Sequence, residues 1–538
     1  MIIDFRLARE LKLPSDIVVI VGAGAAGISL ALSLAGSGVQ VVLIESGGNL
    51  TAPDAMTESA DLNDGLTEGQ RWAGLRDGRA RVLGGATQLW MGQCMRLNEH
   101  ALREREWIEG SGWPIKLTDL EKYYVQAENW LDLSGRGYSA ERWLEHPALT
   151  PIRWNEERLV HHFGEYCPEP QLGTKHRKRL VAHPNIRLIV HATAGCILHE
   201  KGQIRGVEVR DRSGRRSVVS ARCVALCAGA VENTRLLKMS DPAGVGLGAG
   251  REHTGHYLQD HPIICTAEVI PYDYRYIQDR YVILRRDGHR VLPKVRLSPL
   301  AQERYGLLDA AAVFDHVYDT PAIRAAHRLR AKQWDRPWDA LTDAAKASGA
   351  ALPFVRGVYR RYIRGVSFLG IQPSHVWLHV WVEQPPESTR TIMLSNERDA
   401  LGLPKPIVRW NCGPAEIETT RQLTRWIADD LTRLGIARVR ELPAMTNDDS
   451  WLATVRDGFH LAGTTRMSNT PETGVVDLDL QVHGLEGLYV VGGSVFPCSS
   501  YAHPTLTIIA LAFRLADCLR DRWMRVDSGA QARSFQDC

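Results

Sequence analysis

The first strong pattern in the chain is an apolar run that changes to a helical period at a glycine-rich turn. Residues 17–21 (IVVIV) are continuously β-branched, which is typical of a strand buried on both faces. Gly22-Ala-Gly-Ala-Ala-Gly27 follows, and the apolar stretch 28–38 predicts a helix that ends at glycine. A second strand is expected over 39–44. The pattern therefore predicts a βαβ unit near the N-terminus.

Each glycine of this turn has a physical task in binding a dinucleotide. Gly22 permits the tight turn, Gly24 lets the backbone approach a pyrophosphate, and Gly27 lets the helix and strand pack closely. The helix N-terminus offers unpaired N–H groups to the phosphates. Glu45, 21 residues after Gly24, is expected to accept hydrogen bonds from ribose hydroxyls. The glycines of 244–250 follow Ser-Asp-Pro-Ala instead of a strand, so they predict a loop.

The rest of the chain alternates between strand-rich and helical stretches. Short strands recur over 186–229 and predict a small β-meander that leads into a buried strand at 223–228. Alternating strands are expected over 263–315 and 374–411, and a helix over 416–434. Residues 100–180 are expected to be mixed helix and loop.

One segment stands out by its charge. Residues 320–364 have a helical pattern and contain ten Lys and Arg against three Asp. Such a segment is ordinarily a solvated helical face, and docking to an anionic membrane surface or to an electron acceptor is the alternative.

Composition excludes several classes of protein. Apolar residues make up 44% of the 538 positions and charged residues 24%, which is ordinary for a soluble globular protein of two to four domains. The balance of 65 Lys and Arg against 62 Asp and Glu is too even for a dedicated nucleic-acid binder. The ten cysteines show neither a disulfide framework nor zinc-ligand spacing, so no metal is expected.

The N-terminal sequence MIIDFRLARELK lacks a long apolar core and a small-residue cleavage site. No run of about 18 consecutive apolar residues is present, which argues against a membrane span. We therefore expect a cytoplasmic protein without a membrane span. Export together with a partner that carries the signal stays open.

The position of the remaining apolar strands decides which dinucleotide is expected. No second strand–GxGxxG–helix unit is present for a nicotinamide cofactor. Residues 223–240 predict a strand, a small-residue turn and a helix, and residues 487–497 predict a strand that ends in glycines. Residues 501–519 predict the start of a final apolar helix. An N-terminal motif whose sheet is completed by the extreme C-terminus suits a long, enclosed cofactor such as FAD.

Several motifs taken together resemble those of the glucose–methanol–choline (GMC) oxidoreductase family over nearly the whole chain. They are VGAGAAG with Glu45, ARVLGGATQLWMGQ at 80–93, CAGAVENTRLL at 227–237, QDHP at 259–262, HLAGTTRM at 460–467 and GGSVFPCSSYAHPTLT at 492–507. The loop tryptophan, GWP at 112–114 and GTTRM most resemble the branch with pyranose 2-oxidase, C-glycoside 3-oxidase and fructose dehydrogenase-like sugar oxidoreductases.

The resemblance implies an α/β fold with a Rossmann-like FAD-binding domain and a second, antiparallel-sheet substrate-binding domain. The implied segments are 1–100, 186–262 and 452–538 for the FAD-binding domain, 101–185 for a helix and loop extension with lid-like parts, and 263–451 for the substrate-binding domain. The FAD contacts expected from the motifs are Gly22, Gly24, Ala25, Ala26, Gly27, Glu45, Arg81, Gly84, Gly85, Trp90, Gly92, Cys196, Ala228, Gly229, Gly492, Gly493, Ser494, His503, Pro504 and Thr505.

The resemblance also implies a catalytic pair. His460 falls where the family has its catalytic histidine, and His503 where it has a second catalytic His or Asn. Alcohol oxidation removes a hydroxyl proton and sends a hydride to flavin N5, and a neutral imidazole is a suitable base near neutral pH. We expect His460 to be the base and His503 to orient the alcohol oxygen, although the roles are open to being shared or reversed.

Two positions depart from the family pattern. Some members have a flavin-tethering histidine immediately before the loop tryptophan, but here Leu89 precedes Trp90, so FAD is expected to bind non-covalently. Gly493 stands where many members have an acid or alanine before the serine. The contacts to the ribityl and pyrophosphate groups of FAD at this position are then expected from backbone groups and Ser494.

Substrate contacts are expected on the strand 375–383, where His375, Trp377, His379, Trp381 and Glu383 share one face. Trp381, Glu383 and Gln384 are the candidates, because aromatic faces with polar neighbours suit sugar rings. Pairing across an ordinary sheet surface is the alternative.

The leading hypothesis is oxidation of a hydroxyl of a sugar, glycoside or related polyol to a carbonyl. A primary alcohol (aminoglycoside or aliphatic), a non-redox lyase on the same scaffold and a non-catalytic flavoprotein are the alternatives. Oxygen, a quinone or a redox protein would reoxidise the flavin, and an oligomer is possible.

Overall fold

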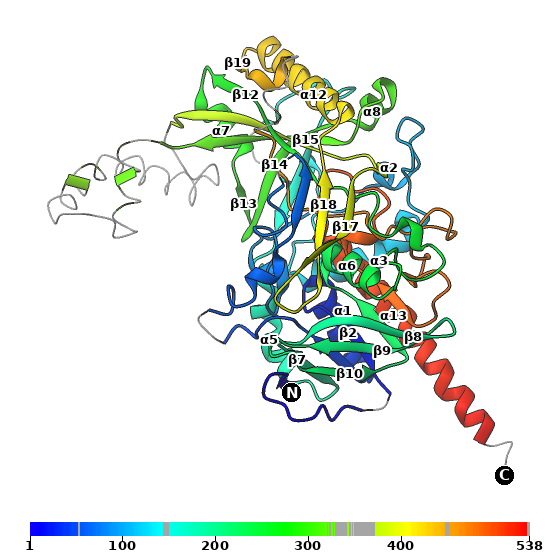
Figure 1. Ribbon diagram of the computed structural model, residues 1–538. Helices are drawn as coiled ribbons and strands as arrows, with labels where there is room; N and C mark the ends of the chain where they lie inside the picture. The colour runs from blue at the N-terminus through cyan, green and yellow to red at the C-terminus, as the bar shows by residue number, and fades with distance from the viewer. Residues whose placement is uncertain are drawn as a thin grey trace.

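The computed structural model of the protein describes residues 1–14, 16–51, 54–70, 72–143, 150–319, 372–446 and 455–534, with isolated positions between 321 and 348 and at 452 and 454. The basic segment predicted at 320–364 lies almost entirely outside the described residues. The described chain forms a parallel sheet with helices at one end and a large antiparallel sheet at the other (Figure 1).

The parallel sheet has six strands in the order β1-β7-β3-β2-β11-β20, and every neighbouring pair in it is parallel. Its strands are β1 (Ile2–Asp4), β2 (Val18–Val21), β3 (Val41–Ile44), β7 (Ile186–Val190), β11 (Cys223–Leu226) and β20 (Leu488–Val490). The continuous β-branched runs form the central strands because both of their faces are buried. Residues from three distant parts of the chain thus share one sheet.

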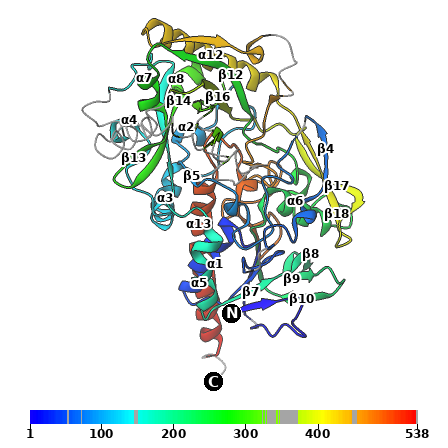
Figure 2. The ribbon, with the colours of Figure 1, turned by 90° about the vertical axis from the view of Figure 1, so that its left-hand side faces the viewer.

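Helices cover this sheet, and the first helix of the chain packs against the last. Helix α1 (Ala25–Gly36) packs against the last helix, α13 (Thr505–Ser534), and against α5 (Leu172–Ala182) (Figure 2). Helix α3 (Leu117–Trp130) also packs against α13. The predicted start of the final helix is confirmed, since α13 begins at Thr505. Among the helices that the structure describes, none has the combination of length and apolar character that crossing a membrane requires.

The predicted meander is confirmed in part. Strands β8 (Thr193–Glu200), β9 (Gln203–Arg210) and β10 (Arg216–Ser220) form an antiparallel three-stranded sheet. The preceding strand, β7, instead belongs to the parallel sheet, because its apolar residues pair with β3 and are buried. The predicted loop at 244–250 is confirmed, since it lies in turns and bends.

The second large sheet is antiparallel and runs in the order β19-β12-β16-β15-β14-β6-β5, with β13 paired to β14. Its strands are β5 (Gln93–Cys94), β6 (Leu159–Tyr166), β12 (Ile263–Pro271), β13 (Leu284–Arg286), β14 (His289–Leu297), β15 (Ala310–Val317), β16 (His375–Val382) and β19 (Ala437–Glu441). The expectation of only helix and loop over 100–180 was therefore wrong for β6, whose eight residues pair with β14. Helix α12 (Pro414–Arg433) packs against β12, β15, β16 and β19, close to the helix predicted over 416–434.

A smaller sheet, β17-β18-β4, pairs β17 (Thr391–Arg398) with β18 (Pro404–Trp410), and β18 with β4 (Leu66–Gly69). The other helices in the described ranges are α2 (Glu99–Leu102), α4 (Ala140–Trp143), α6 (Gly229–Met239), α7 (Tyr274–Tyr281) and α8 (Pro299–Tyr305). Short 3-10 turns lie at Ala60–Asn63, Gly85–Gln88, Arg251–His253, Pro443–Met445 and Gly493–Val495. Two main apolar cores result, one around each large sheet.

Candidate functional site

The first part of the site is the glycine turn between β2 and α1. Gly22 has a φ of +100°, and a Cβ there would lie 2.7 Å from the Cys227 carbonyl oxygen. A Cβ on Gly27 would lie 1.9 Å from the Gly22 carbonyl oxygen, so neither position accepts a side chain. Gly24 differs, because a Cβ built on it has no protein atom within 4 Å. The turn therefore leaves open space at the position where a pyrophosphate is expected to approach.

Glu45 follows β3 and faces this turn. Its Oε2 accepts a hydrogen bond from the Ala23 backbone N–H at 3.1 Å, and its Oε1 accepts one from the Gly47 N–H at 2.9 Å. Burial raises the pKa of this carboxyl, against the lowering effect of these two N–H groups. The structure thus places Glu45 at the carboxyl end of the sheet beside the glycine turn.

The loop at 80–93 lies against the same turn. The Gly84 N–H donates to the Ala23 carbonyl at 2.8 Å, and a Cβ on Gly85 would lie 3.2 Å from the Gly24 Cα. The Trp90 indole N–H donates to the Pro170 carbonyl at 2.6 Å, and the Gly92 carbonyl accepts from the Cys167 N–H. These contacts anchor the loop beside the dinucleotide turn.

Arg81 lies in this loop, but its guanidinium forms hydrogen bonds and an ion pair with other protein groups. It donates to Asn63 Oδ1 and to the Leu62 carbonyl, each at 2.9 Å, and it lies 2.8 Å from a Glu232 carboxylate oxygen. Its side chain is therefore positioned to hold the loop to α6. Cys196 is half-buried on β8, where its thiol contacts the Ile197 carbonyl.

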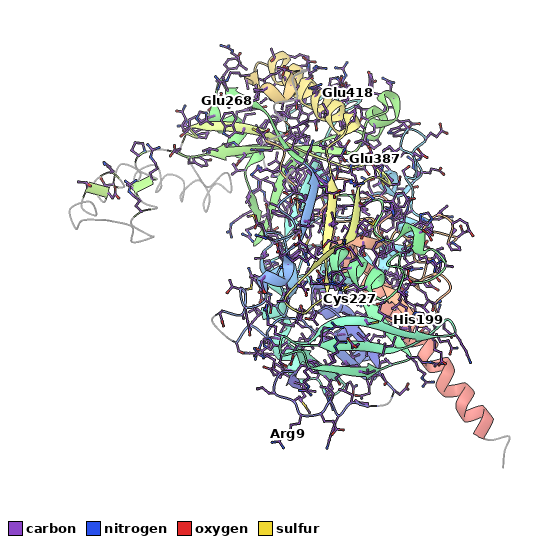
Figure 3. The ribbon with its side chains drawn as sticks, in the orientation of Figure 1. Arg9, His199, Cys227, Glu268, Glu387 and Glu418 are labelled. Atoms are coloured by element: carbon purple, nitrogen blue, oxygen red, sulfur yellow. The ribbon has the colours of Figure 1, made fainter. Side chains whose placement is uncertain are left out.

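A second glycine turn follows β11. Figure 3 labels Cys227, which directly follows this strand. The Ala228 N–H donates to Asn233 Oδ1 at 2.8 Å, and Gly229, with a φ of +81°, has no atom within 4 Å of a built Cβ. Asn233 Nδ2 donates to Ser494 Oγ at 3.3 Å, which joins this turn to the segment after β20. A Cβ on Gly493 would lie 2.4 Å from the Leu461 carbonyl oxygen.

These features fit an FAD molecule. Two glycine turns at the carboxyl ends of parallel strands both leave open space beside the backbone, at Gly24 and Gly229. Ala25 and Ala26 begin helix α1, whose free N–H groups suit the pyrophosphate. Thr505 begins helix α13, and Pro504 directly precedes it. Among the described residues no group of three or more His, Cys, Asp or Glu is arranged to hold a metal ion.

The second part of the site is the pair His460 and His503, which the fold brings together from 43 residues apart in the sequence. Their ring centroids are 4.5 Å apart, and the two ring planes are inclined by 67°. The Trp381 ring lies 5.6 Å from His460 and 5.2 Å from His503. Burial lowers the pKa of both imidazoles, and Lys294 lowers them further. Both histidines are therefore neutral near neutral pH and available as hydrogen-bond acceptors or bases.

A third histidine, His261, contacts the ring of His460. Its Nδ1 lies 2.9 Å from Nδ1 of His460, so one of the two rings donates to the other. Burial lowers the pKa of His261 to about 3, which keeps this ring neutral as well. If the proton of this bond is on His460 Nδ1, the Nε2 lone pair of His460 is free to accept a proton. The motif QDHP at 259–262 contains His261, but no role was predicted for this residue from the motif.

Lys294 is a site residue that sequence reasoning missed. It lies on β14 and is only 1% exposed, and its Nζ is 3.1 Å from Nε2 of His503. The same Nζ lies 5.3 Å from the centroid of the Trp381 ring. Burial lowers the pKa of this ammonium to about 7. The only sequence signal was that two basic residues, Lys294 and Arg296, alternate with Val295 and Leu297.

The three predicted substrate contacts have different surroundings in the structure. It brings Trp381 against both histidines, whereas Glu383 and Gln384 are completely buried and bonded to protein. Glu383 accepts from both terminal nitrogens of Arg105 at 2.7 Å and from the Ser500 N–H at 3.0 Å. Gln384 Oε1 accepts from the Asp260 N–H and from the Trp410 indole. The expectation that Glu383 and Gln384 point to the substrate is not supported, because their polar atoms hold the loops that carry His460 and His503.

Cys498 shares the buried cluster of Arg105 and Glu383. Its sulfur lies 2.8 Å from an Arg105 nitrogen and 2.8 Å from Glu383 Oε1. Burial raises the pKa of the thiol to about 12, with a further contribution from the Glu383 charge. The thiol is therefore protonated and takes no part as a nucleophile.

The fold and the site define a dinucleotide-dependent oxidoreductase with a buried histidine pair. Residues 18–361 match the family model of FAD dependent oxidoreductase, and residues 386–512 match that of GMC oxidoreductase. The chain belongs to the FAD dependent oxidoreductase family, and its C-terminal part is a GMC oxidoreductase domain. Its homologues are GMC-type oxidases and dehydrogenases that act on CH–OH groups. FAD is its cofactor.

Individual relatives show what the chain is similar to. It is 26% identical over 359 residues to 2-methyl-1,2-propanediol dehydrogenase of Mycolicibacterium austroafricanum, a match covering 65% of this chain and 57% of that protein. It is 24% identical to paromamine 6'-oxidase of Streptomyces fradiae, over 93% of this chain and 90% of that protein. Among solved structures, a formate oxidase has a TM-score of 0.56 at 19% identity, over 95% of this chain and 99% of that one. That structural likeness shows the fold alone.

Proposed function

We propose that the protein oxidises a hydroxyl of a sugar, glycoside or related polyol to a carbonyl, with His460 as the base and His503 as the group that orients the alcohol oxygen. The observation that carries this proposal is the pair of neutral imidazoles 4.5 Å apart, with one tryptophan ring against both. Bound FAD supplies the two-electron acceptor for the hydride.

The protein groups divide the proton chemistry between them. His460 takes the hydroxyl proton, and the backbone of His460 is held by Asp260 while this happens. His503 holds the same oxygen from a second direction. Trp381 offers an apolar face for the C–H side of a sugar ring, which fixes the reacting carbon relative to both imidazoles. The residues that we propose to hold FAD are those of the two glycine turns, the loop at 80–93 and the start of α13.

Oxidation of a primary alcohol is the second candidate. It is favoured by the similarity to paromamine 6'-oxidase, which spans 93% of this chain. A polycationic aminoglycoside would however meet the buried Lys294 beside His503, and like charges disfavour such a complex. We therefore rank neutral polyols and glycosides ahead of aminoglycosides. A non-redox lyase would use the same histidines without reducing the flavin.

An anaerobic titration of the purified holoprotein tests these candidates. Sugars, glycosides, aminoglycosides and simple alcohols are added in turn while the visible absorbance of the flavin is recorded. We expect bleaching by a neutral polyol or glycoside. Bleaching only by aminoglycosides or aliphatic alcohols would replace the substrate class, and no bleaching by any compound would favour the lyase. Admission of air then separates an oxidase, which recovers its colour quickly, from a dehydrogenase with a quinone or protein acceptor.

A further inference from the structure

Lys294 is a buried cation that lies beside His503. Within the described part of the chain, its Nζ has no Asp or Glu oxygen within the 4.0 Å that defines an ion pair. The polar group it contacts is Nε2 of His503, at 3.1 Å. An ammonium has three N–H donors, so two donors remain beyond the one that faces His503.

The neighbouring buried cations are compensated, which makes Lys294 different. Arg296, two residues further along β14, lies 2.9 Å from the Asp309 carboxylate. Arg105 forms a two-pronged pair with Glu383 at 2.7 Å. A buried charge without a partner costs several kcal/mol, roughly, in real proteins. Packing alone would be served by methionine or leucine at position 294, so the lysine has to be explained by what it does.

The position of Nζ points to that role. It lies 5.3 Å from the Trp381 ring centroid and 5.5 Å from that of Tyr501, and Trp381 contacts both catalytic histidines. Lys294, Trp381, His460 and His503 thus surround the place where the proposed function puts the substrate oxygen. Because the ammonium is fixed before substrate binds, it acts without reorganisation, which is what makes such groups effective in a buried site.

We propose that Lys294 is a catalytic residue, whose ammonium stabilises the negative charge that develops on the substrate oxygen as His460 removes its proton. The inference rests on the proposed function. In the step, the O–H proton goes to His460, the electron pair of the C–H bond leaves as hydride to FAD, and the C=O bond forms. Lys294 exchanges neither a proton nor an electron.

The surroundings of Lys294 determine when it is charged. The titratable and charged groups facing it from β6, β14, the segment before β15 and the loops are His162, His261, Arg296, Asp309, His460, Tyr501 and His503. The imidazoles are neutral and Asp309 is paired to Arg296, so burial dominates and lowers the pKa to about 7. A protonated Lys294 is needed for the step, so the rate is expected to fall as pH rises through this value.

The test is the rate of anaerobic flavin reduction by saturating substrate over a range of pH, in the wild-type holoenzyme and in Lys294→Met and Lys294→Arg. We expect Lys294→Met to be slower by about 10²-fold and to lose the fall at high pH. Lys294→Arg should keep part of the rate and move the fall to higher pH, because a guanidinium stays protonated. Lys238→Met is the matched control, since Lys238 on α6 is also buried but donates to the Val245 carbonyl in the loop that follows this helix.

A binding measurement supplies a readout that does not depend on turnover. Acetate carries a negative oxygen and cannot be oxidised as an alcohol, so we titrate it against the oxidised holoprotein and follow the flavin spectrum. We expect acetate to bind to the wild type more weakly as pH rises through about 7, and to lose at least about 10-fold of its affinity in Lys294→Met.

The outcomes separate this inference from the proposed function. If Lys294→Met keeps the wild-type rate, pH profile and acetate affinity while His460→Ala is slow, the lysine proposal is wrong and the proposed function stands. If His460→Ala also keeps the full rate, the proposed function is wrong. Should Lys294→Met lose FAD, Lys294→Arg decides alone, and an unmoved pH profile in that variant overturns the proposal.

Discussion

The Asp260 carboxylate holds the backbone of His460, whose N–H donates to Asp260 Oδ1 at 2.8 Å. The same oxygen accepts from the His261 N–H at 2.7 Å, and the His261 ring contacts the His460 ring. One buried carboxylate therefore fixes two histidines, and its other oxygen accepts from the Trp72 indole at 3.1 Å. Burial, with the nearby Asp457, raises the pKa of Asp260 to about 6.

Replacing Asp260 should slow the reaction through His460. In Asp260→Ala the two backbone N–H groups lose their acceptor, and we expect flavin reduction to slow by about 10-fold to 10²-fold, because small displacements of a catalytic group are costly. Asp260→Asn keeps an acceptor oxygen and should retain most of the rate. Anaerobic stopped-flow absorbance measures both. Equal rates in the two variants would show that the hydrogen bonds do not position His460.

Substituting Gly24 should remove the cofactor without unfolding the protein. Its backbone has ordinary negative φ, and a side chain there meets no protein atom within 4 Å. In Gly24→Leu we therefore expect normal far-ultraviolet circular dichroism but a flavin-to-protein absorbance ratio near zero. Gly36→Leu is the control, because Gly36 ends the same helix and is equally open. Full FAD occupancy in Gly24→Leu would contradict the assigned pyrophosphate position.

Glu383 should matter for stability more than for substrate binding. Removing one partner of a buried ion pair costs about 3–5 kcal/mol, so Glu383→Gln should lower the free energy of unfolding by roughly that amount. The exposed pair of Glu68 and Arg409 is the comparison, and Glu68→Gln should cost at most about 1 kcal/mol. Denaturant titration measures both. A raised KM with unchanged stability would restore Glu383 as a substrate contact.

Lys294 should make stability depend on pH in a defined direction. Its folded-state pKa, about 7, lies below the unfolded value of 10.5, so its destabilising effect is complete below pH 7 and disappears as pH rises to 10.5. Lys294→Met should therefore be more stable than the wild type by about 1–4 kcal/mol at pH 7 and below. Denaturant titrations with excess FAD at several pH values should show the difference shrinking as pH increases. A constant difference would mean that Lys294 is already neutral or that packing alone has changed.

Local patterns were sufficient to predict much of the fold. The turn from Gly22 to Gly27 and the helix starting at Thr505 are fixed by residues that are neighbours in sequence, because glycine sterics and helix-start signals act over a few positions. Strand β6 was missed, since His161 and His162 interrupt its apolar pattern and it gains its partner, β14, from more than 120 residues away. Strand β7 was grouped with the meander because its apolar pattern is similar to that of the strands that follow it. Its pairing with β3 is what places it in the parallel sheet.

The site residues, too, were predicted where a local motif contains them and missed where their roles depend on distant contacts. His460 and His503 were predicted because each lies in a distinctive motif. His261 and Lys294 were not assigned, because their roles depend on which side of β14 and of the 259–262 loop faces the pair. Glu383 was predicted as a substrate contact because it continues the alternation of β16, and only the distant Arg105 shows that its carboxylate is held in a buried ion pair.

The most direct test of the account is the rate of anaerobic flavin reduction in the wild type, His460→Ala and His503→Ala, each with its FAD content measured first. We expect both variants to keep FAD, and His460→Ala to be slower by about 10²-fold or more, because it lacks the base. Unchanged reduction rates in both FAD-loaded variants would contradict the claim that this histidine pair carries out the oxidation.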